Sequence, residues 1–143
     1  MNLNKLGRTQ VTTLDRSETV LKAAVTMAEK GVGSIVVLSG GKPAGILTDR
    51  DIVVRVVREG LDPKATVVGD VMTADLLTVT SDVEPLEAAA RMRARQVRRL
   101  PIVGSKGELI GLLTLDDLLH HFGRGLDTLA DVIAHFPAEH FGG

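Results

Sequence analysis

Two copies of one short motif hold the residue types in this chain that could bind a charged ligand. The first copy reads GILTDRDI at residues 45–52, and the second reads GLLTLDDL at residues 111–118. Both contain a threonine where an apolar strand is expected to give way to a helix. Free backbone N–H groups and the helix dipole favour an anion at such a junction, and the hydroxyl adds a donor to phosphate. An aspartate three residues later lies on the same side of the helix and can accept hydrogen bonds from ribose hydroxyls.

The candidate residues are Thr48 and Asp51 in the first copy and Thr114 and Asp117 in the second. A structural role competes with binding at each position, since threonine is a common helix cap and a first-turn aspartate complements the helix dipole. Because the pair occurs twice beside a glycine, binding is at least as well supported as capping alone. The glycine itself either allows close backbone approach or marks a strand bulge, and the sequence leaves both readings open.

The motif is duplicated because a larger unit is duplicated. Residues 11–38 align with residues 76–103 at an offset of 65, and one inserted residue then shifts the offset to 66. Each unit begins with a short extended piece and continues into a helix with an apolar stripe. Two strands separated by a glycine-containing turn follow, and a second helix starts at the motif threonine. This order predicts a β-α-β-β-α unit.

We predict an α/β (α+β) fold of two such repeats packed about a pseudo-two-fold axis, because a unit of about 60 residues is too small to bury a good core alone. The first repeat is expected at residues 8–62 and the second at residues 76–122. Residues 63–75 form a linker, in which VVGDVMT predicts a short helix leading into the second repeat. Residues 123–143 form a C-terminal helix and tail.

The C-terminal segment carries an apolar stripe at helical spacing, and Pro137 is expected to end this helix. The stripe could cover one face of the repeats, pack in a dimer or hold a partner. We expect that it simply packs against the repeats. All four histidines also lie near this end, but adjacent histidines point to different faces of a helix, so no metal site is expected. The stripe is formed by Leu126, Leu129, Ala130 and Ile133, and the histidines are His120, His121, His135 and His140.

The composition of the 143 residues excludes several classes of protein. The absence of cysteine excludes disulfides, thiolate zinc sites and cysteine nucleophiles. A formal net charge of -1 gives no support for general nucleic-acid binding. No apolar run approaches the roughly 18–20 residues that span a bilayer, and no signal-peptide pattern is visible, so we expect a cytoplasmic location without membrane contact. No arrangement of serine, histidine and aspartate is visible, and we expect no catalytic residue and no enzymatic activity.

The duplicated unit, the two Thr-x-x-Asp motifs and the linker VGDVMT resemble a tandem pair of cystathionine β-synthase (CBS) domains, also called a Bateman module. The resemblance covers residues 8–122, and GILTDRDIVVRVVREGLDP is similar to bacterial members that consist of the pair alone. It implies that an adenine nucleotide (AMP, ADP or ATP) or a related adenosyl compound binds in clefts between the repeats, with no obligatory cofactor. It also implies that two pairs assemble into a homodimer.

The same resemblance implies that each cleft combines the leading segments of one repeat with the Thr-x-x-Asp motif of the other. One cleft would hold Thr13, Val32, Gly33, Ser34, Thr114, Asp116 and Asp117. The other would hold Thr78, Val97, Arg98, Arg99, Thr48, Arg50 and Asp51. Only the second set contains arginines, whose guanidinium groups bind phosphate in a forked geometry, so we predict that it is the stronger nucleotide site.

The leading hypothesis is a non-enzymatic sensor, in which a nucleotide changes the packing between repeats or protomers and a protein partner reads that change. One alternative is an interaction or structural module without a ligand. Another is a nucleic-acid binder that uses the stretch RMRARQVRR, although this stretch can equally be a solvated helix face. Two intact motifs favour the sensor, and nucleic-acid binding is not expected.

Overall fold

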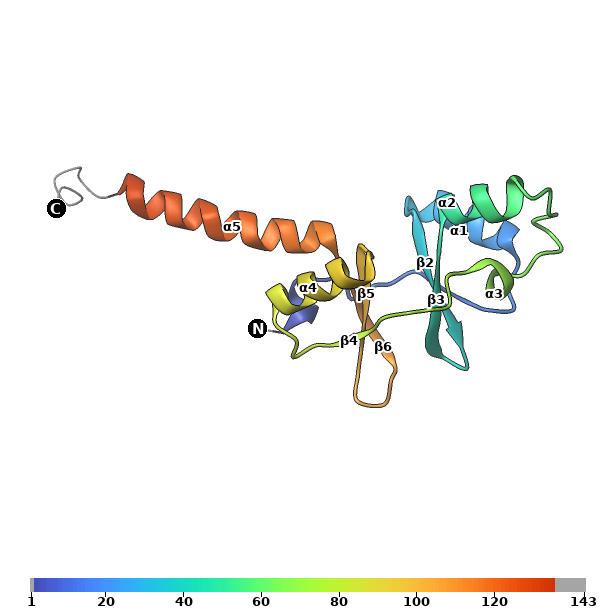
Figure 1. Ribbon diagram of the computed structural model, residues 1–143, viewed down its shortest axis with the longest axis horizontal. Coiled ribbons are helices and arrows are strands. Elements are labelled where there is room, and N and C mark those ends of the chain that lie inside the picture. The colour runs from blue at the N-terminus through green and yellow to red at the C-terminus, as the bar shows by residue number, and fades with distance from the viewer. Residues whose placement is uncertain (1, 136–143) are drawn as a thin grey trace.

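A computed structural model describes residues 2–135, which form two repeats with the same order of elements (Figure 1). The first repeat contains β1 (Thr13–Asp15), α1 (Val20–Lys30), β2 (Ser34–Ser39), β3 (Lys42–Thr48) and α2 (Asp49–Ile52), which continues into the π-helical η2 (Val53–Val57). The second repeat contains β4 (Val79–Thr80), α4 (Pro85–Arg95), β5 (Arg99–Val103), β6 (Leu109–Thr114) and α5 (Leu115–Ala134). The short helices η1 (Leu3–Lys5) and α3 (Val68–Val71) precede the first and second repeats.

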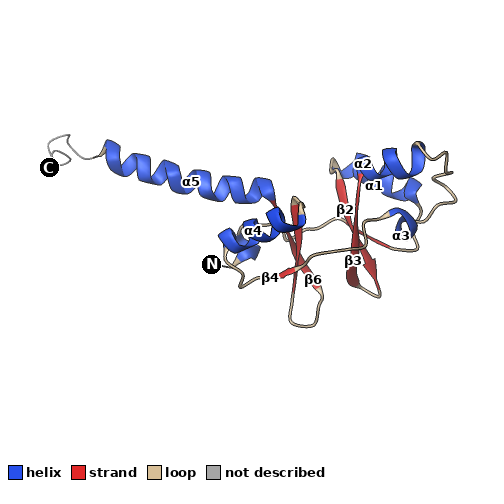
Figure 2. Ribbon diagram, viewed as in Figure 1, coloured by secondary structure: helices blue, strands red, loops and turns tan. Residues whose placement is uncertain are grey.

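Each repeat forms its own three-stranded sheet, in the orders β1-β2-β3 and β4-β5-β6. The first strand of each sheet is parallel to the second, with Thr13 opposite Val36 and Val79 opposite Ile102, and the third strand is antiparallel. Figure 2 shows the two sheets side by side in the middle of the molecule, with the helices of each repeat on its outer side. The predicted fold of two β-α-β-β-α repeats is confirmed.

Two separate apolar cores lie between the sheets and their helices. Strand residues two apart point to one face of a sheet, and helix residues three or four apart meet them there. The cores contain the same positions of the repeat, which explains why the two units share their apolar pattern. The first core includes Ala23, Met27, Ile35, Val37 and Leu47, and the second includes the repeat equivalents Ala88, Met92, Leu100, Ile102 and Leu113.

The short helix ahead of each repeat packs into the core of the other repeat. Leu3 in η1 is fully buried in the core of the second repeat, and Val68 in α3 is fully buried in the core of the first. These two residues are related by the repeat offset of 65, so the exchange follows the pseudo-two-fold relation. The short helix expected in VVGDVMT is present, and it packs against the repeat that precedes it in sequence as well as leading into the next.

After each of these short helices, the chain runs beside the third strand of the repeat whose core the helix has joined. Arg8 exchanges backbone hydrogen bonds of 2.9 and 3.0 Å with Leu112, and Thr73 exchanges bonds of 2.9 and 3.0 Å with Ile46. We call residues 8–12 and 73–77 the crossing segments. A Cβ added at Gly45 would lie 2.7 Å from the Thr73 carbonyl oxygen, and the strand beside it shifts register at the same place. The motif glycine therefore serves close backbone approach, and an irregularity in the strand accompanies it.

The expectation that the C-terminal helix packs against the repeats is wrong. The last helix of the second repeat and the C-terminal helix are one continuous element, α5, which projects away from the body of the molecule (Figure 1). All of residues 124–135 are exposed, including Leu126 at 68% and Ile133 at 63%, because no other described element lies beside this half of the helix. Pro137 lies outside the described residues. None of the helices within residues 2–135 combines the length and apolar character needed to cross a membrane.

Candidate functional site

Each motif threonine forms a reciprocal capping box with the aspartate three residues later. The Asp51 N–H donates to Thr48 Oγ1 at 3.1 Å, and the Thr48 N–H donates to Asp51 Oδ2 at 3.0 Å. The corresponding distances between Asp117 and Thr114 are 3.1 and 2.8 Å. The threonine and aspartate of both motif copies therefore cap a helix. Capping is compatible with binding, because each hydroxyl keeps its proton for donation and each carboxylate keeps a second oxygen, which in Asp51 lies 3.6 Å from the Arg55 guanidinium.

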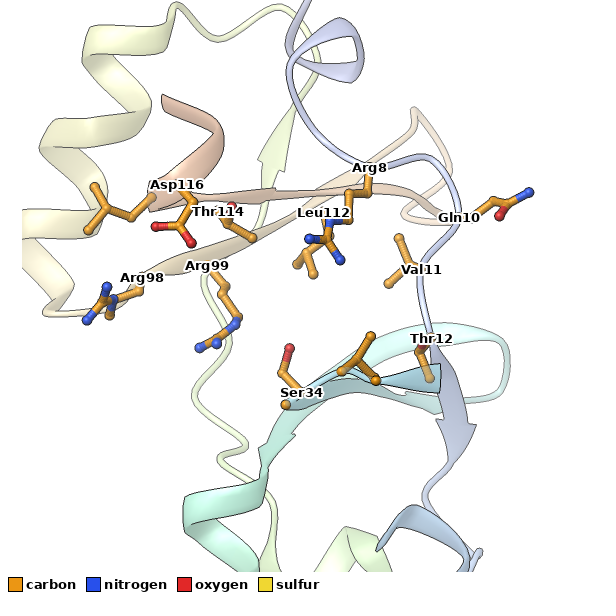
Figure 3. Close-up of a pocket in the computed structure, with 14 residues that line it drawn as sticks. Arg8, Gln10, Val11, Thr12, Ser34, Arg98, Arg99, Leu112, Thr114 and Asp116 are labelled. Carbon is orange, nitrogen blue, oxygen red and sulfur yellow. The ribbon is translucent and has the colours of Figure 1, made fainter. Parts of the chain in front are cut away.

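The first cavity has a volume of about 350 Å³ and lies between the two repeats (Figure 3). The predicted residues that line it are Val32, Gly33, Ser34, Thr114 and Asp116. Thr13 and Asp117 are not among its lining residues, and the Asp117 carboxylate faces its own cap. The first crossing segment closes one side of the cavity, and Figure 3 shows the Arg8 side chain among the residues that surround it.

The second cavity has a volume of about 270 Å³ and uses the equivalent elements of the opposite repeats. The predicted residues that line it are Thr48, Asp51, Val97, Arg98 and Arg99. Thr78 and Arg50 are not among its lining residues, and Arg50 is exposed on α2. The second crossing segment closes this cavity, as the first segment closes the other.

The two first-strand threonines miss the cavities by one position. Thr12 lines the first cavity and Leu77 lines the second, whereas Thr13 and Thr78 follow them in the chain. Adjacent residues of an extended chain point to opposite sides, so the residue before each predicted threonine faces the cavity. A role of Thr13 and Thr78 in binding a ligand therefore stays a prediction.

Sequence reasoning also missed the crossing segments as cavity walls. Residues 8, 10, 11 and 12 line the first cavity, and residues 73, 75, 76 and 77 line the second. These two sets are related by the offset of 65 that defines the repeat. The sequence therefore held a signal for these cavity walls. Extending the repeat alignment to residues before 11 and 76 would have included both sets in the repeat.

The charges of the two cavities differ from the sequence-based expectation. Arg98 and Arg99 line both cavities, and Arg8 lines the first alone. The first cavity thus has three arginines and one aspartate, Asp116, whereas the second has two arginines and two aspartates. The charge argument for the second cleft as the stronger anion site therefore does not hold, and the balance of charge favours the first.

The rest of the arginine-rich stretch behaves as a solvated helix face. The Arg91 guanidinium pairs with Glu87 one turn away on α4, and Arg95 pairs with Asp75 at 2.7 Å. All four side chains of these pairs are substantially exposed, so the pairs contribute little to stability. Arg93, also exposed, lines neither cavity.

The two carboxyl groups whose pKa values are lowered lie away from the cavities. A hydrogen bond from the Ser17 hydroxyl lowers the pKa of Asp15, and one from the Thr80 hydroxyl lowers the pKa of Asp82. Both carboxylates are exposed, one at the end of β1 and the other just after β4. Within residues 2–135 no three His, Asp or Glu side chains are grouped closely enough to hold a metal ion, and His140 lies outside this range.

Comparison with known proteins agrees with the duplicated architecture. Residues 4–58 and 68–124 each match the family described as CBS domain. The CBS domain-containing protein YhcV of Bacillus subtilis is 38% identical over 110 residues, which span 77% of this chain and 77% of that protein. A solved protein with CBS domains from Burkholderia ambifaria is 33% identical, with a TM-score of 0.75 over 85% of this chain and 93% of that one. The CBS domain protein PAE2072 of Pyrobaculum aerophilum, solved in complex with AMP, is 25% identical, with a TM-score of 0.73 over 82% of this chain and 89% of that one.

Proposed function

Since this chain belongs to the CBS domain family, we propose that it is a non-enzymatic regulatory module that binds an adenine nucleotide or another adenosyl ligand between its repeats. The observation that carries this proposal is the pair of inter-repeat cavities, each lined by a motif threonine together with Arg98 and Arg99. The AMP complex of PAE2072 supports this class of ligand.

The groups in the first cavity match the parts of a nucleotide. Arg8, Arg99 and the Thr114 hydroxyl are donors suited to phosphate oxygens, and Asp116 is an acceptor suited to a ribose hydroxyl. The Val32 N–H already donates to the Met27 carbonyl oxygen at 3.1 Å, so Val32 can offer an adenine ring its carbonyl oxygen and its apolar side chain. The second cavity offers an equivalent set with Thr48 and Asp51, without a counterpart of Arg8.

Regulation is favoured over catalysis by the chemistry of the lining residues. The two cavities are lined by arginines, threonines, aspartates, one serine, glutamines and glycine or apolar residues, and neither lining includes a histidine that could serve as a base. Asp51 is held in its capping box and lies 3.6 Å from Arg55, an arrangement that fixes the carboxylate in place and suits ligand orientation. A ligand that contacts both repeats can alter their packing, and a protein partner can read that change.

Thermal unfolding followed by circular dichroism tests the proposal. We expect AMP, ADP, ATP or S-adenosylmethionine to raise the Tm, since a ligand at 100 times its Kd adds about 2.7 kcal/mol to the stability of the folded state. The Arg99→Ala variant should lose most of the rise with a phosphorylated ligand, whereas Arg93→Ala, a control on the exposed face of α4, should retain it. If none of these compounds raises the Tm of the unaltered chain, the proposal fails for them.

We also propose that a second copy of this chain covers the exposed half of α5. Its apolar side chains follow the alternating spacing of four and three residues that lets two helices pack along a left-handed seam. If two copies pair antiparallel, Leu126 meets the partner's Leu129 and Phe122 meets the partner's Ile133, so the stripe is complementary to itself. The exposed residues of this seam are Leu119, Leu126, Leu129 and Ile133, and the half-buried Phe122, which also packs against the second core, lies in line with them.

The extent of the stripe fits a homodimer. Four exposed side chains at about 100 Å² each would remove roughly 400 Å² of apolar surface per copy, and a standard interface buries about 800 Å² per partner, of which somewhat more than half is apolar. Light scattering during size-exclusion chromatography should show a dimer. The double variant Leu126→Asp/Leu129→Asp should be a monomer, and Thr128→Asp, which adds a charge to the other face of the same helix, should remain a dimer. A double variant that stays dimeric would refute the assignment to α5.

A further inference from the structure

We propose that Arg98 and Arg99 act as one anion-binding pair shared by both cavities, so that a first phosphorylated ligand weakens the binding of a second. This inference rests on the proposed function, because it concerns the charge of a ligand held in the same cavities. Uncharged ligands of the same class should fill the two cavities without this loss of affinity for the second ligand.

The sharing arises from a difference between equivalent positions of the two repeats. Gly33 and Ser34 correspond to Arg98 and Arg99 at the repeat offset of 65. Gly33 and Ser34 line the first cavity alone, whereas the two arginines line both. Glycine and serine are too short to reach beyond their own cavity, while an arginine side chain spans the junction. Figure 3 shows Arg99 extending from the start of β5 toward Ser34 on the other repeat.

The backbone under the two arginines is held in place, so only their side chains can follow a ligand. The Leu115 N–H donates to the Arg98 carbonyl oxygen at 2.9 Å, and Arg99 pairs with Thr114 in the sheet register. Within the described residues, neither guanidinium forms an ion pair with a carboxylate. The pair is therefore free to bind an anion from either cavity, but its position between them does not change.

The two cavities differ in the charged groups that they keep once a ligand has engaged the pair. The first cavity adds Arg8 to the pair, so a phosphorylated ligand should occupy it first. The second cavity is then left with Asp51 and Asp75, which already engage the guanidinium groups of Arg55 and Arg95. A second phosphate would lack free guanidinium donors and would face carboxylates. Loss of even one charge-assisted hydrogen bond weakens binding by roughly tenfold or more.

Isothermal titration of the full chain with adenosine and with ADP tests this inference. Adenosine should fill two sites of similar affinity per chain, whereas ADP should bind in two steps whose Kd values differ at least about tenfold. In the double variant Arg98→Ala/Arg99→Ala, the tight ADP step should weaken, and the ratio of the two Kd values should shrink to the difference that Arg8 alone sustains. The Arg98→Lys/Arg99→Lys variant keeps the charge and should retain two separate ADP steps, and Arg93→Ala should behave as the unaltered chain.

The outcomes separate this inference from the proposed function. Two independent and equal ADP sites in the unaltered chain would overturn the sharing of the pair and leave nucleotide binding intact. The same conclusion would follow if the ratio of the two ADP Kd values were unchanged in the double alanine variant with its fold retained by circular dichroism. Binding of neither adenosine nor ADP would remove the proposed function for these ligands, and the inference with it.

Discussion

Replacing Gly45 with alanine should destabilise the protein, because the second crossing segment lies against this glycine. The added Cβ would lie 2.6 Å from the Met72 sulfur and 2.7 Å from the Thr73 carbonyl oxygen. The Met72 side chain can turn away at small cost. The Thr73 carbonyl belongs to the backbone and accepts a hydrogen bond of 3.0 Å from the Ile46 N–H, so it cannot move without disturbing that pairing.

The size of the effect follows from the contacts that must be lost. To reach an ordinary van der Waals separation, the Thr73 carbonyl must retreat by about 0.7 Å or more. This movement lengthens both backbone hydrogen bonds between Thr73 and Ile46, each with a net contribution of about 1 kcal/mol. With the strain of overpacking included, the free energy of unfolding should fall by roughly 2–4 kcal/mol.

Urea unfolding followed by far-ultraviolet circular dichroism measures this change, since the chain has no tryptophan or tyrosine for fluorescence. Gly123→Ala is the matched control, because Gly123 lies in α5 and an added Cβ meets nothing within 4 Å. Alanine in a helix interior is favoured over glycine, so the control should be more stable by about 0.5–1 kcal/mol. If Gly45→Ala unfolds at the same urea concentration as the unaltered chain while the control behaves as stated, the reasoning about the crossing segment is wrong.

Two further predictions address the N-terminal helix and the acid range. Leu3→Ala should lower the free energy of unfolding by about 2–5 kcal/mol, because Leu3 is fully buried in the second core although it precedes the first repeat; a loss below about 0.5 kcal/mol in urea unfolding would contradict this placement. The hydrogen bond from Ser17 lowers the pKa of Asp15 in the folded state, so it stabilises the fold above the ordinary value of 3.8 and ceases to do so as the pH falls through the lowered pKa. Ser17→Ala should therefore be less stable than the unaltered chain at neutral pH, and the difference should shrink in acid; a constant difference from pH 7 to pH 2 would refute the linkage.

Much of the repeat was predictable because its signals are local. Short continuous apolar runs in SIVVL and RLPIV place β2 and β5, and the capping box needs only a threonine and an aspartate three residues apart. The duplication then predicts that two such units pack together. The predicted cleft residues at Val32, Ser34 and Val97 line cavities for the same reason, since their position at the start of a strand is part of the repeat.

The errors concern contacts that depend on partners distant in sequence. The strand pattern marks Thr13 and Thr78 as part of a strand, but only the packed structure shows that their preceding neighbours face the cavities. The apolar stripe of α5 predicts a covered helix, yet an apolar pattern does not state whether the covering element belongs to the same chain. In the structure no described element covers it.

The sequence by itself determined a duplicated β-α-β-β-α unit and two Thr-x-x-Asp motifs, because both depend on residues close together in the chain. Only the tertiary structure decided which core each short helix enters, since the two cores present nearly the same apolar positions to a short apolar helix. It also decided that Arg98 and Arg99 stand between both cavities while their counterparts Gly33 and Ser34 reach one. The physical reason is that the pseudo-two-fold axis brings equivalent segments together, and side-chain length then determines which of them extends across it.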